Sequence, residues 1–300
     1  MTEKLVAAFD VGGTSVKAAL LDEELRQLAA LREPTARGTD GTATAEAIGD
    51  QVARLVAGFD RQVAAVGVVI PGIVDDQAGI ARFSANLGWR EVPFADLLRR
   101  RLDVPVAFGH DVTAGGLAEY RLGAARGFAS AVVLPVGTGI AAALLLDGRP
   151  YRAGGLAGEL GHIDVGHQEK CGCGATGCLE AIASAAAIAR RFAARTGRPA
   201  AGAEQVVQAA RAGDPDAAAV LEEAVHALGR GIHTLTTLLA PEVVVLGGGL
   251  FGAGDFVLDP LRHWLSARLT FQRMPELRVA ELGDEAGCLG AGLLALEAAG

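Results

Sequence analysis

Short and almost unbroken apolar runs recur along the chain and predict buried β-strands. They cover residues 4–9, 16–21, 63–70, 104–108 and 243–246. Continuous apolar runs of this length are typical of strands buried on both faces of a parallel sheet. The third run is followed directly by Pro71 and Gly72, which predicts a turn at the carboxyl end of that strand.

Segments with helix-type apolar spacing separate the strands. In residues 43–58 the side chains at 48, 52, 55 and 56 lie on one face of the predicted helix. Asp214 followed by Pro215 predicts a helix start, because Asp caps the first turn and Pro fits the first helical position. The other predicted helices cover residues 93–102, 178–196, 214–239 and 287–299. This alternation indicates an α/β protein with an at least partly parallel sheet.

The first strand–glycine turn–strand segment recurs in the second half of the chain. Residues 8–22 (AFDVGGTSVKAALLD) align with residues 133–147 (VLPVGTGIAAALLLD) at a fixed offset of 125. We interpret the match as a duplication, in which two lobes begin with the same hairpin and bring one glycine turn to a shared cleft. Chance recurrence in a chain rich in Gly, Ala and Leu is the alternative. The predicted lobes are 1–113 and 114–286, with a C-terminal helix at about 287–300 that packs on the first.

Composition narrows the class of protein. The apolar share of 51% excludes a disordered chain, and 300 residues fit two lobes better than one. The net charge of −8 argues against a general nucleic-acid binder, which needs a basic face. The sequence shows neither a secretory leader nor an apolar window of about 18 residues, which favours a cytoplasmic protein without membrane spans.

Glycine is abundant, with 41 residues, and three glycine-rich turns at strand ends are candidate phosphate loops. In the first, Gly12 and Gly13 offer backbone N–H groups, Thr14 adds a hydroxyl, and Lys17 is a nearby cation. Asp10 would repel a phosphate directly, so a carboxylate there suggests bound Mg²⁺. An ordinary hairpin turn is the alternative.

The second and third turns also follow apolar strands. They consist of Gly137, Thr138 and Gly139, and of Gly247, Gly248 and Gly249. The third would let a flat adenine or ribose approach the backbone. Neither turn matches the P-loop or dinucleotide-binding pattern, and each could be structural by itself. Three such turns in one chain favour nucleotide binding.

Three of the four cysteines, Cys171, Cys173 and Cys178, lie within eight positions. With one histidine they suit a tetrahedral zinc site, and the intervening glycines let the sulfurs converge. His162 and His167 are both candidates for the fourth ligand, and a loop of free thiols is the alternative. Four protein ligands leave no position for a catalytic water, so the predicted zinc is structural.

Asp111 follows the predicted strand 104–108 and precedes a helix. A carboxylate at a strand end of an α/β protein is well placed to act as a base, although a plain helix N-cap is the alternative. Asn86, Glu159, His162 and Glu180 offer the paired acceptors and amide groups that a polyhydroxylated substrate needs. Each of them alone is more often a solvated or capping group.

The chain resembles the ROK family of sugar kinases, and most closely its bacterial glucokinase-like members. The shared motifs run over nearly the full length: DVGGTSVKAALLD, IPGIVD, NLGW, VGTGIAAALLLDG, AGELGHIDV, CGCGATGCLE and VVVLGGGL. The resemblance implies an α/β fold of the two-lobed actin-like ATPase (ribonuclease H-like) type with a duplicated strand–Gly turn–strand core. It also implies ATP-dependent phosphorylation of a hexose and a homo-oligomer, either a dimer or a tetramer.

The resemblance also implies roles for particular residues. ATP would lie between the lobes, with its phosphates near the first and second glycine turns, its adenosine towards the third, and Asp10 on Mg²⁺. Asp111 would be the general base, and Asn86, Glu159, His162 and Glu180 would contact the sugar. The resemblance favours His162 as the zinc ligand in the loop 162–178, with one ring nitrogen on zinc and the other towards a sugar hydroxyl.

His110 departs from the family pattern, which usually has Asn before the base and places that Asn on the sugar. A histidine is bulkier and can be cationic near neutral pH, so we keep His110 as a candidate sugar contact while the assignment to glucose weakens. The alternatives are an N-acetylmannosamine or N-acetylglucosamine kinase and a non-catalytic sugar sensor. The donor is ATP or polyphosphate, and no N-terminal DNA-binding domain is expected, because the first strand begins by residue 5.

Overall fold

The computed structural model describes residues 4–300, so residues 1–3 of the predicted first lobe lie outside the described part. The chain divides into two compact units. Unit 1 comprises Met1–Ala118, Arg152–Ala157 and Asp284–Gly300, and unit 2 comprises Glu119–Tyr151 and Gly158–Gly283. The sequence predicts a boundary between 113 and 114, whereas the division falls inside a helix, after Ala118, and a short segment near 155 returns to unit 1.

Unit 1 is built on a five-stranded sheet in the order β3-β2-β1-β4-β8. Its strands are β1 (Val6–Val11), β2 (Ser15–Leu21), β3 (Gln27–Pro34), β4 (Ala65–Ile70) and β8 (Val106–His110). The first three are antiparallel neighbours, while β4 and β8 run parallel to β1. Every residue of β4 is buried, as the apolar run predicts. The edge strand β3 is mostly exposed, and the sequence analysis misses it because its short apolar run, residues 28–31, is followed directly by the charged Arg32 and Glu33.

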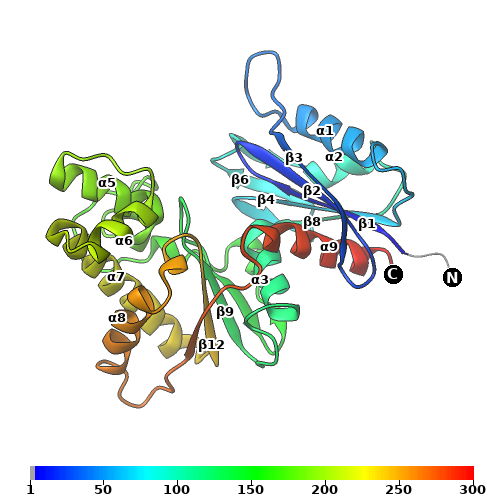
Figure 1. Ribbon diagram of the computed structural model, residues 1–300. Coiled ribbons are helices and arrows are strands. Elements are labelled where there is room, and N and C mark those ends of the chain that lie inside the picture. Colours follow the sequence, from blue (N-terminus) through cyan, green and yellow to red (C-terminus); the bar gives the residue numbers. More distant parts are fainter. Residues whose placement is uncertain (1–3) are drawn as a thin grey trace. The chain divides into compact units, whose positions relative to one another are not determined.

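Helices cover both faces of this sheet (Figure 1). α1 (Ala45–Ala57) and α2 (Phe94–Arg99) contribute to the main apolar core on one face, and α9 (Ala286–Ala298) packs on β1, β4 and β8. A Cβ on Gly67 would lie only 1.9 Å from the carbonyl oxygen of Ala291, so glycine in β4 permits this close approach of α9. The fourth helix, α3 (Asp111–Arg121), begins at the end of β8.

Unit 1 also holds a small antiparallel sheet of β5 (Ile73–Asp75), β6 (Ile80–Ser84) and β7 (Trp89–Val92). The turn between β6 and β7 carries Asn86. The short segment Arg152–Ala157 packs beside β5, where the Arg152 Nε lies 2.9 Å from an Asp76 carboxylate oxygen. This ion pair links two parts of unit 1 that are far apart in the sequence.

Unit 2 repeats the sheet topology of unit 1. Its strands are β9 (Ala131–Pro135), β10 (Ala143–Leu146), β11 (Arg149–Pro150), β12 (Val243–Gly247) and β13 (Glu276–Val279), in the order β11-β10-β9-β12-β13. β9, β10 and β11 are antiparallel neighbours, and β12 and β13 run parallel to β9. Adding 125 to the first residue of β1 gives the first residue of β9. The predicted duplicated core is therefore confirmed.

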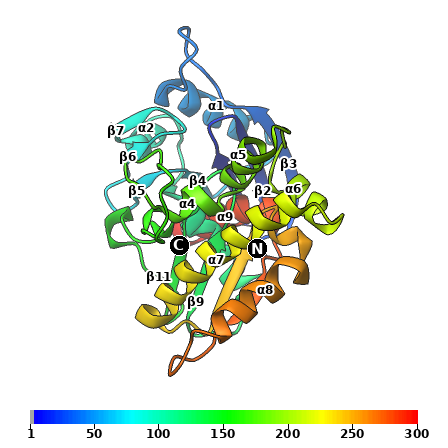
Figure 2. The same ribbon diagram turned by 90° about the vertical axis from the view of Figure 1, so that its left-hand side faces the viewer.

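Five α-helices of unit 2 follow β11 in the chain: α4 (Leu179–Ala183), α5 (Ala185–Thr196), α6 (Ala203–Arg211), α7 (Pro215–Leu239) and α8 (Asp255–Ser266). The prediction of one helix over 178–196 is wrong, because the chain leaves the helical conformation at Ser184, whose hydroxyl caps α5. The predicted start of α7 is confirmed by its Asp214 cap. α7 packs against α8 (Figure 2), where a Cβ on Gly229 would collide with the Trp264 ring.

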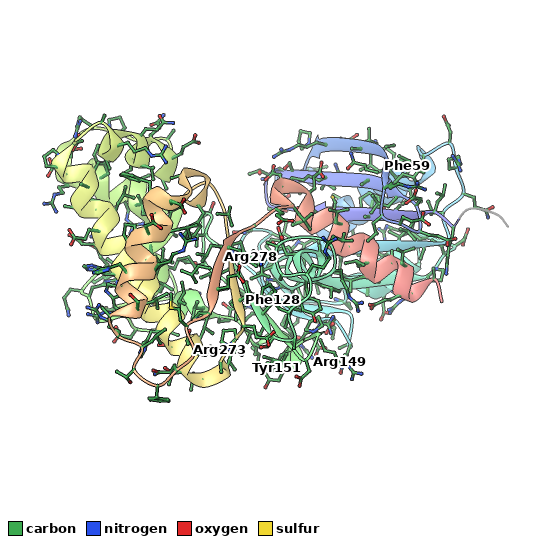
Figure 3. The ribbon with its side chains drawn as sticks, turned by 60° about the horizontal axis from the view of Figure 1, so that its bottom comes forward. Phe59, Phe128, Arg149, Tyr151, Arg273 and Arg278 are labelled. Atoms are coloured by element: carbon green, nitrogen blue, oxygen red, sulfur yellow. The ribbon has the colours of Figure 1, made fainter. Side chains whose placement is uncertain are left out.

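The edge of the unit 2 sheet is anchored by Arg278 on β13. Its guanidinium lies 4.8 Å from the centre of the Phe128 ring and donates to the Ala124 carbonyl oxygen at 3.1 Å (Figure 3). Nearby, the buried Glu119 carboxylate accepts hydrogen bonds from the backbone N–H groups of Ala124 and Leu282. Among the described residues, no helix is both long and apolar enough to cross a membrane.

Candidate active site and metal site

The carboxyl ends of two parallel strands in unit 1 carry three candidate residues. Asp10 lies near the end of β1, His110 is the last residue of β8, and Asp111 begins α3. β4 separates the two strands and pairs with both of them. In open α/β sheets, ligands bind at the carboxyl ends of parallel strands, so this edge of the unit 1 sheet is the candidate catalytic edge.

Asp10 is largely buried and surrounded by charge. Burial raises the pKa of its carboxyl to about 6, the negative charge of Asp111 adds to the rise, and Lys17 opposes it. The Lys17 ammonium lies 3.8 Å from Asp10 and donates to the Asp284 carbonyl oxygen at 2.9 Å. The two neighbouring carboxylates, Asp10 and Asp111, repel each other, and one lysine offsets this repulsion only in part. A divalent cation would therefore stabilise their ionised forms. Carboxylate oxygens are also ligands that Mg²⁺ prefers.

The first glycine turn joins β1 to β2 in unit 1. The Gly12 amide donates to the Ser15 carbonyl oxygen, and the Thr35 hydroxyl donates to the Gly12 carbonyl oxygen at 2.6 Å. A Cβ on Gly13 would lie 2.7 Å from the backbone oxygen of Asn86, so the predicted sugar contact Asn86 lies directly against the predicted phosphate turn. Thr14 is exposed at the tip of this turn.

Asp111 differs from the helix caps found elsewhere in the chain. Thr44 and Ser184 accept from the amide three residues on, and Asp214 accepts from the amides two and three residues on, as N-cap side chains do. Asp111 Oδ1 instead accepts from the amide of Val112, the next residue, at 2.7 Å. The same oxygen lies 3.1 Å from the Nε2 of His110. These contacts favour a role for this carboxylate beyond capping.

The second glycine turn lies in unit 2, between β9 and β10. Gly137, Thr138 and Gly139 are all exposed. Glu180 on α4 approaches this turn, because its Oε2 accepts from the Ile140 amide at 2.9 Å and would lie 2.6 Å from a Cβ on Gly139. The predicted sugar contact Glu180 is thus tied to the turn that is predicted to bind phosphate.

The third glycine turn follows β12 in unit 2. Gly247 is buried at the strand end, while Gly248 and Gly249 are exposed. Gly248 has a φ of +96°, and a Cβ there would lie 2.1 Å from the Val136 carbonyl oxygen. Both constraints require glycine. The second and third turns therefore touch through the Val136 backbone, and the structure brings these two predicted nucleotide contacts together.

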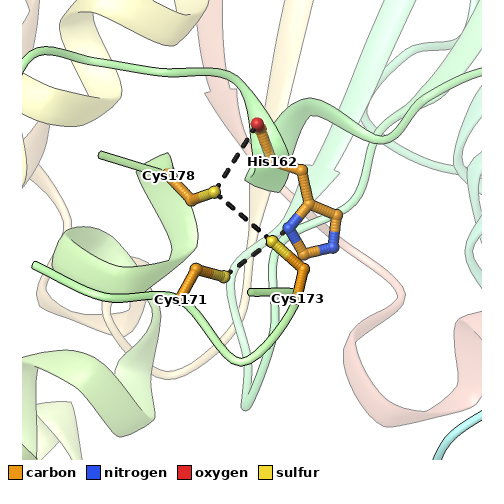
Figure 4. A group of neighbouring side chains, drawn as sticks. All are labelled: His162, Cys171, Cys173 and Cys178. Atoms are coloured by element: carbon orange, nitrogen blue, oxygen red, sulfur yellow. Dashed lines mark hydrogen bonds between the residues drawn. The ribbon is translucent and has the colours of Figure 1, made fainter. Parts of the chain in front are cut away.

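Four metal-binding side chains converge in unit 2 (Figure 4). The ligand atoms of His162, Cys171, Cys173 and Cys178 all lie within 4.8 Å of one another. The Cys173 and Cys178 sulfurs are 3.7 Å apart, as are the Cys171 sulfur and the His162 Nδ1. A tetrahedral site with Zn–S bonds of about 2.3 Å has edges of about 3.8 Å, so this donor set fits a zinc ion.

The other candidate histidine, His167, lies outside this cluster. Its Nδ1 accepts from the Glu169 amide, and its Nε2 lies 3.1 Å from the Cys178 carbonyl oxygen. The second ring nitrogen of His162 lies 3.9 Å from the Glu159 carboxylate. Burial raises the pKa of the Cys178 thiol to about 12, so this thiol needs a bound cation to become the thiolate that a zinc site requires.

The structure also shows contacts that the sequence pattern misses. Thr113 lies 3.2 Å from the His110 Nδ1, and Asp76 and Arg152 line the same small cavity as His110. A spacing of three residues at a helix start could have indicated the Thr113 contact. The Arg152 contact depends on a distant segment that returns to unit 1, and no local signal reveals it.

The duplicated sheets and their glycine turns define an actin-like ATPase fold. The model of the ROK family matches residues 6–298. A glucokinase from Streptomyces coelicolor is 32% identical, with 98% of each chain covered, and an N-acetylmannosamine kinase from Escherichia coli O157:H7 is also 32% identical, with 96% of this chain and 97% of the relative covered. The crystal structure of a ROK family glucokinase from Streptomyces griseus, in complex with glucose and AMPPNP, superposes with a TM-score of 0.81 at 32% identity, covering 98% of this chain and 99% of that one. The chain belongs to the ROK family.

Proposed function

We propose that the protein phosphorylates a hexose with ATP. The observation that carries this proposal is the catalytic edge of unit 1, where Asp10 and Asp111 stand at the ends of parallel strands in a ROK chain. The relatives that cover the whole chain include glucokinases, which supports a hexose as the acceptor.

Asp111 is the proposed general base. As the sugar hydroxyl attacks the γ-phosphate of ATP, its proton passes to the Asp111 carboxylate, and the bond between the γ-phosphorus and the bridging oxygen of ADP breaks. A positioned base contributes about 10²–10⁴-fold to such a step, and the remaining acceleration comes from alignment and charge stabilisation. Asn86, Glu159, His162 and Glu180 are the proposed sugar contacts, and His110 is treated separately below.

The glycine turns are the proposed nucleotide contacts. Gly12, Gly13 and Thr14 of unit 1 and the 137–139 turn of unit 2 offer N–H and hydroxyl donors to the phosphates, and the 247–249 turn faces the adenosine. We assign Asp10 to hold Mg²⁺, which supplies positive charge to the phosphate oxygens when it is bound. Lys17, which contacts Asp10 and Asp284, balances the charge of this edge.

The His162–cysteine cluster is the proposed zinc site. Its four protein ligands complete a tetrahedron, which is typical of structural rather than catalytic zinc. A zinc ion there would hold the loop between His162 and Cys178, and with it the neighbouring Glu159 and Glu180. The predictions of a cytoplasmic homo-oligomer and of the donor, ATP or polyphosphate, stay predictions.

An N-acetylhexosamine is the alternative acceptor, favoured by two observations. Identity to the glucokinase and to the N-acetylmannosamine kinase is the same, 32%. In addition, His110 replaces the Asn that the family usually places on the sugar, which weakens the assignment to glucose. His110 is also the main argument for a non-catalytic sugar sensor, but this alternative is weaker, because Asp10, Asp111 and all three glycine turns are retained.

A coupled ADP-release assay over a sugar panel tests the proposal. The panel contains glucose, mannose, fructose, N-acetylmannosamine and N-acetylglucosamine, each with ATP and Mg²⁺. We expect turnover with at least one of glucose, mannose and fructose, and a loss of about 10²-fold or more in Asp111→Asn with the fold retained. Turnover only with the N-acetylated sugars would select the alternative acceptor. Sugar-dependent thermal stabilisation without any turnover would select the sensor.

A further inference from the structure

His110 lies between the proposed base and a neighbouring hydroxyl. Its Nε2 is 3.1 Å from Asp111 Oδ1, and its Nδ1 is 3.2 Å from Thr113 Oγ1. The His110 side chain is 18% exposed and that of Asp111 is 29% exposed. Both ring nitrogens therefore have a polar partner within unit 1, whereas a sugar contact would need one of them to be available.

The hydrogen-bonding chemistry of Asp111 and Thr113 indicates which nitrogen of the His110 ring carries the proton. An ionised carboxylate only accepts hydrogen bonds, so the nitrogen that faces Asp111 carries the proton in the attractive arrangement. In a neutral imidazole the other nitrogen is then an acceptor, and the hydroxyl of Thr113 can donate to it. The His110 ring thus lies between the Thr113 hydroxyl, which hydrogen-bonds to its Nδ1, and Oδ1 of the base, which its Nε2 contacts at 3.1 Å.

The two oxygens of Asp111 have different surroundings. Oδ1 accepts from the Val112 amide at 2.7 Å and faces the His110 ring. Among the described residues of unit 1, no group donates a hydrogen bond to Oδ2. A carboxylate held through one oxygen presents the other in a fixed direction, which is what a general base requires.

A small cavity and a charged pair also lie beside His110. A cavity of about 10 Å³ lies against His110 and Thr113 and is also lined by Asp76 and Arg152. These two side chains pair with each other at 2.9 Å. A cavity of that size holds about one water molecule, so no sugar ring fits into it.

We propose that His110 is a positioning residue for Asp111 instead of a sugar contact, and that Thr113 fixes the ring orientation. The inference rests on the proposed function, in which Asp111 is the base. The proton of the sugar hydroxyl passes to Oδ2, the hydroxyl oxygen forms its bond to the γ-phosphorus, and the electron pair of the broken bond leaves with ADP. His110 and Thr113 keep their protons throughout.

Two pairs of variants test the proposal. His110→Ala removes the contact to Oδ1, while His110→Gln places an N–H at nearly the position of the ring Nε2. Thr113→Val removes the hydroxyl at constant shape, and Thr113→Ser keeps it. We expect kcat to fall about 10- to 100-fold in His110→Ala, since misplacement of a reacting group costs up to about 10²-fold. Thr113→Val should lose about 3-fold, and KM for the sugar should stay within about 2-fold in both. His110→Gln and Thr113→Ser should recover most of the lost turnover.

The split between kcat and KM separates the possible outcomes. A rise in the sugar KM at unchanged kcat would make His110 a sugar contact and overturn the proposal, as would unchanged kinetics or a loss that His110→Gln does not recover. Folding of each variant is checked by circular dichroism and thermal unfolding, and Thr113→Val carries the test if His110→Ala does not fold. Asp111→Asn is assayed alongside, because full turnover in that variant would refute the proposed function itself, whatever the His110 variants do.

Discussion

Units 1 and 2 share one hairpin but differ in its charge. At the offset of 125, Asp10 corresponds to Pro135 and Lys17 to Ala142. Asp10 and Lys17 are cross-strand partners in unit 1 and face each other at 3.8 Å, whereas the matching positions of unit 2 carry no charge. The duplicated backbone is therefore the same, and the residues that can hold a cation are confined to the first copy.

Unit 2 instead gains its polar chemistry from later segments. Glu180 reaches its glycine turn from α4, and the His162–cysteine cluster lies in the loop just before that helix. Among the described residues, this cluster is the only group of three or more side chains positioned to share a metal ion. In unit 2 the repeat therefore supplies only the scaffold and residues outside the repeat supply the metal site, whereas in unit 1 the repeat itself carries the candidate cation ligand Asp10. The following predictions test this division.

The largest expected effect is the loss of the metal site of unit 2. Cys171→Ser removes one of the four ligands, and we expect loss of bound zinc and a fall of more than about 3 kcal/mol in the free energy of unfolding, because metal binding contributes folding free energy. Zinc content by elemental analysis and thermal unfolding measure both. Cys288→Ser is the matched control, since Cys288 is buried in unit 1 outside the cluster. Equal zinc content in Cys171→Ser and the control would refute the assignment.

The second largest effect is expected on catalysis, from a change at Asp10, the acidic position of the unit 1 hairpin. Asp10→Asn keeps the shape but removes the charge, and we expect kcat to fall about 100-fold, with a higher Mg²⁺ requirement. Steady-state assays across a Mg²⁺ series measure it. Asp284→Asn is the control, because Asp284 also contacts Lys17 but is exposed. Similar losses in both variants would assign the effect to Lys17 instead of a cation site.

The raised pKa of Asp10 predicts a pH dependence of stability at a position whose counterpart in unit 2, Pro135, cannot titrate. The folded pKa of about 6 exceeds the ordinary value of 3.8, so the folded state binds this proton more tightly and its stability falls as pH rises from about 4 to 6. Without Mg²⁺, Asp10→Asn should become more stable than the wild type by about 2 kcal/mol at pH 7.5, after allowance for partial exposure, and should match it near pH 4. Urea unfolding at the two pH values measures the difference. A constant difference would contradict the assignment.

Some features of both units could be predicted from the sequence, and others could not. The buried strands, the offset repeat and the helix that begins after Asp214 are local patterns, and the structure confirms them. The break at Ser184 was missed because an alanine-rich stretch has high helix propensity on both sides of it. The contacts of His110 with Asp111 and Thr113, and the return of residues 152–157 to unit 1, depend on tertiary packing. The chemistry of candidate residues could thus be predicted more readily than their partners.

The smallest expected effect is on stability, and it distinguishes the glycine turn of unit 1 from the 137–139 turn of unit 2. A Cβ on Gly13 would lie 2.7 Å from the Asn86 carbonyl oxygen, whereas a Cβ on Gly137, which aligns with Gly12 in the other turn, would meet nothing within 4 Å. Gly13→Ala should therefore lower the free energy of unfolding by about 1–3 kcal/mol through overpacking, while Gly137→Ala should change it by less than about 0.5 kcal/mol. Chemical denaturation measures both values.

The kinetic effect of Gly137→Ala is then the informative one. Because that methyl group would project into open space beside the turn, a rise in KM for ATP at unchanged stability would show that the nucleotide approaches this backbone closely. An unchanged KM would mean that the unit 2 turn keeps glycine without a phosphate contact. In that case the three glycine turns would have different roles, and the turn of unit 1 would bind the phosphates without help from the 137–139 turn of unit 2.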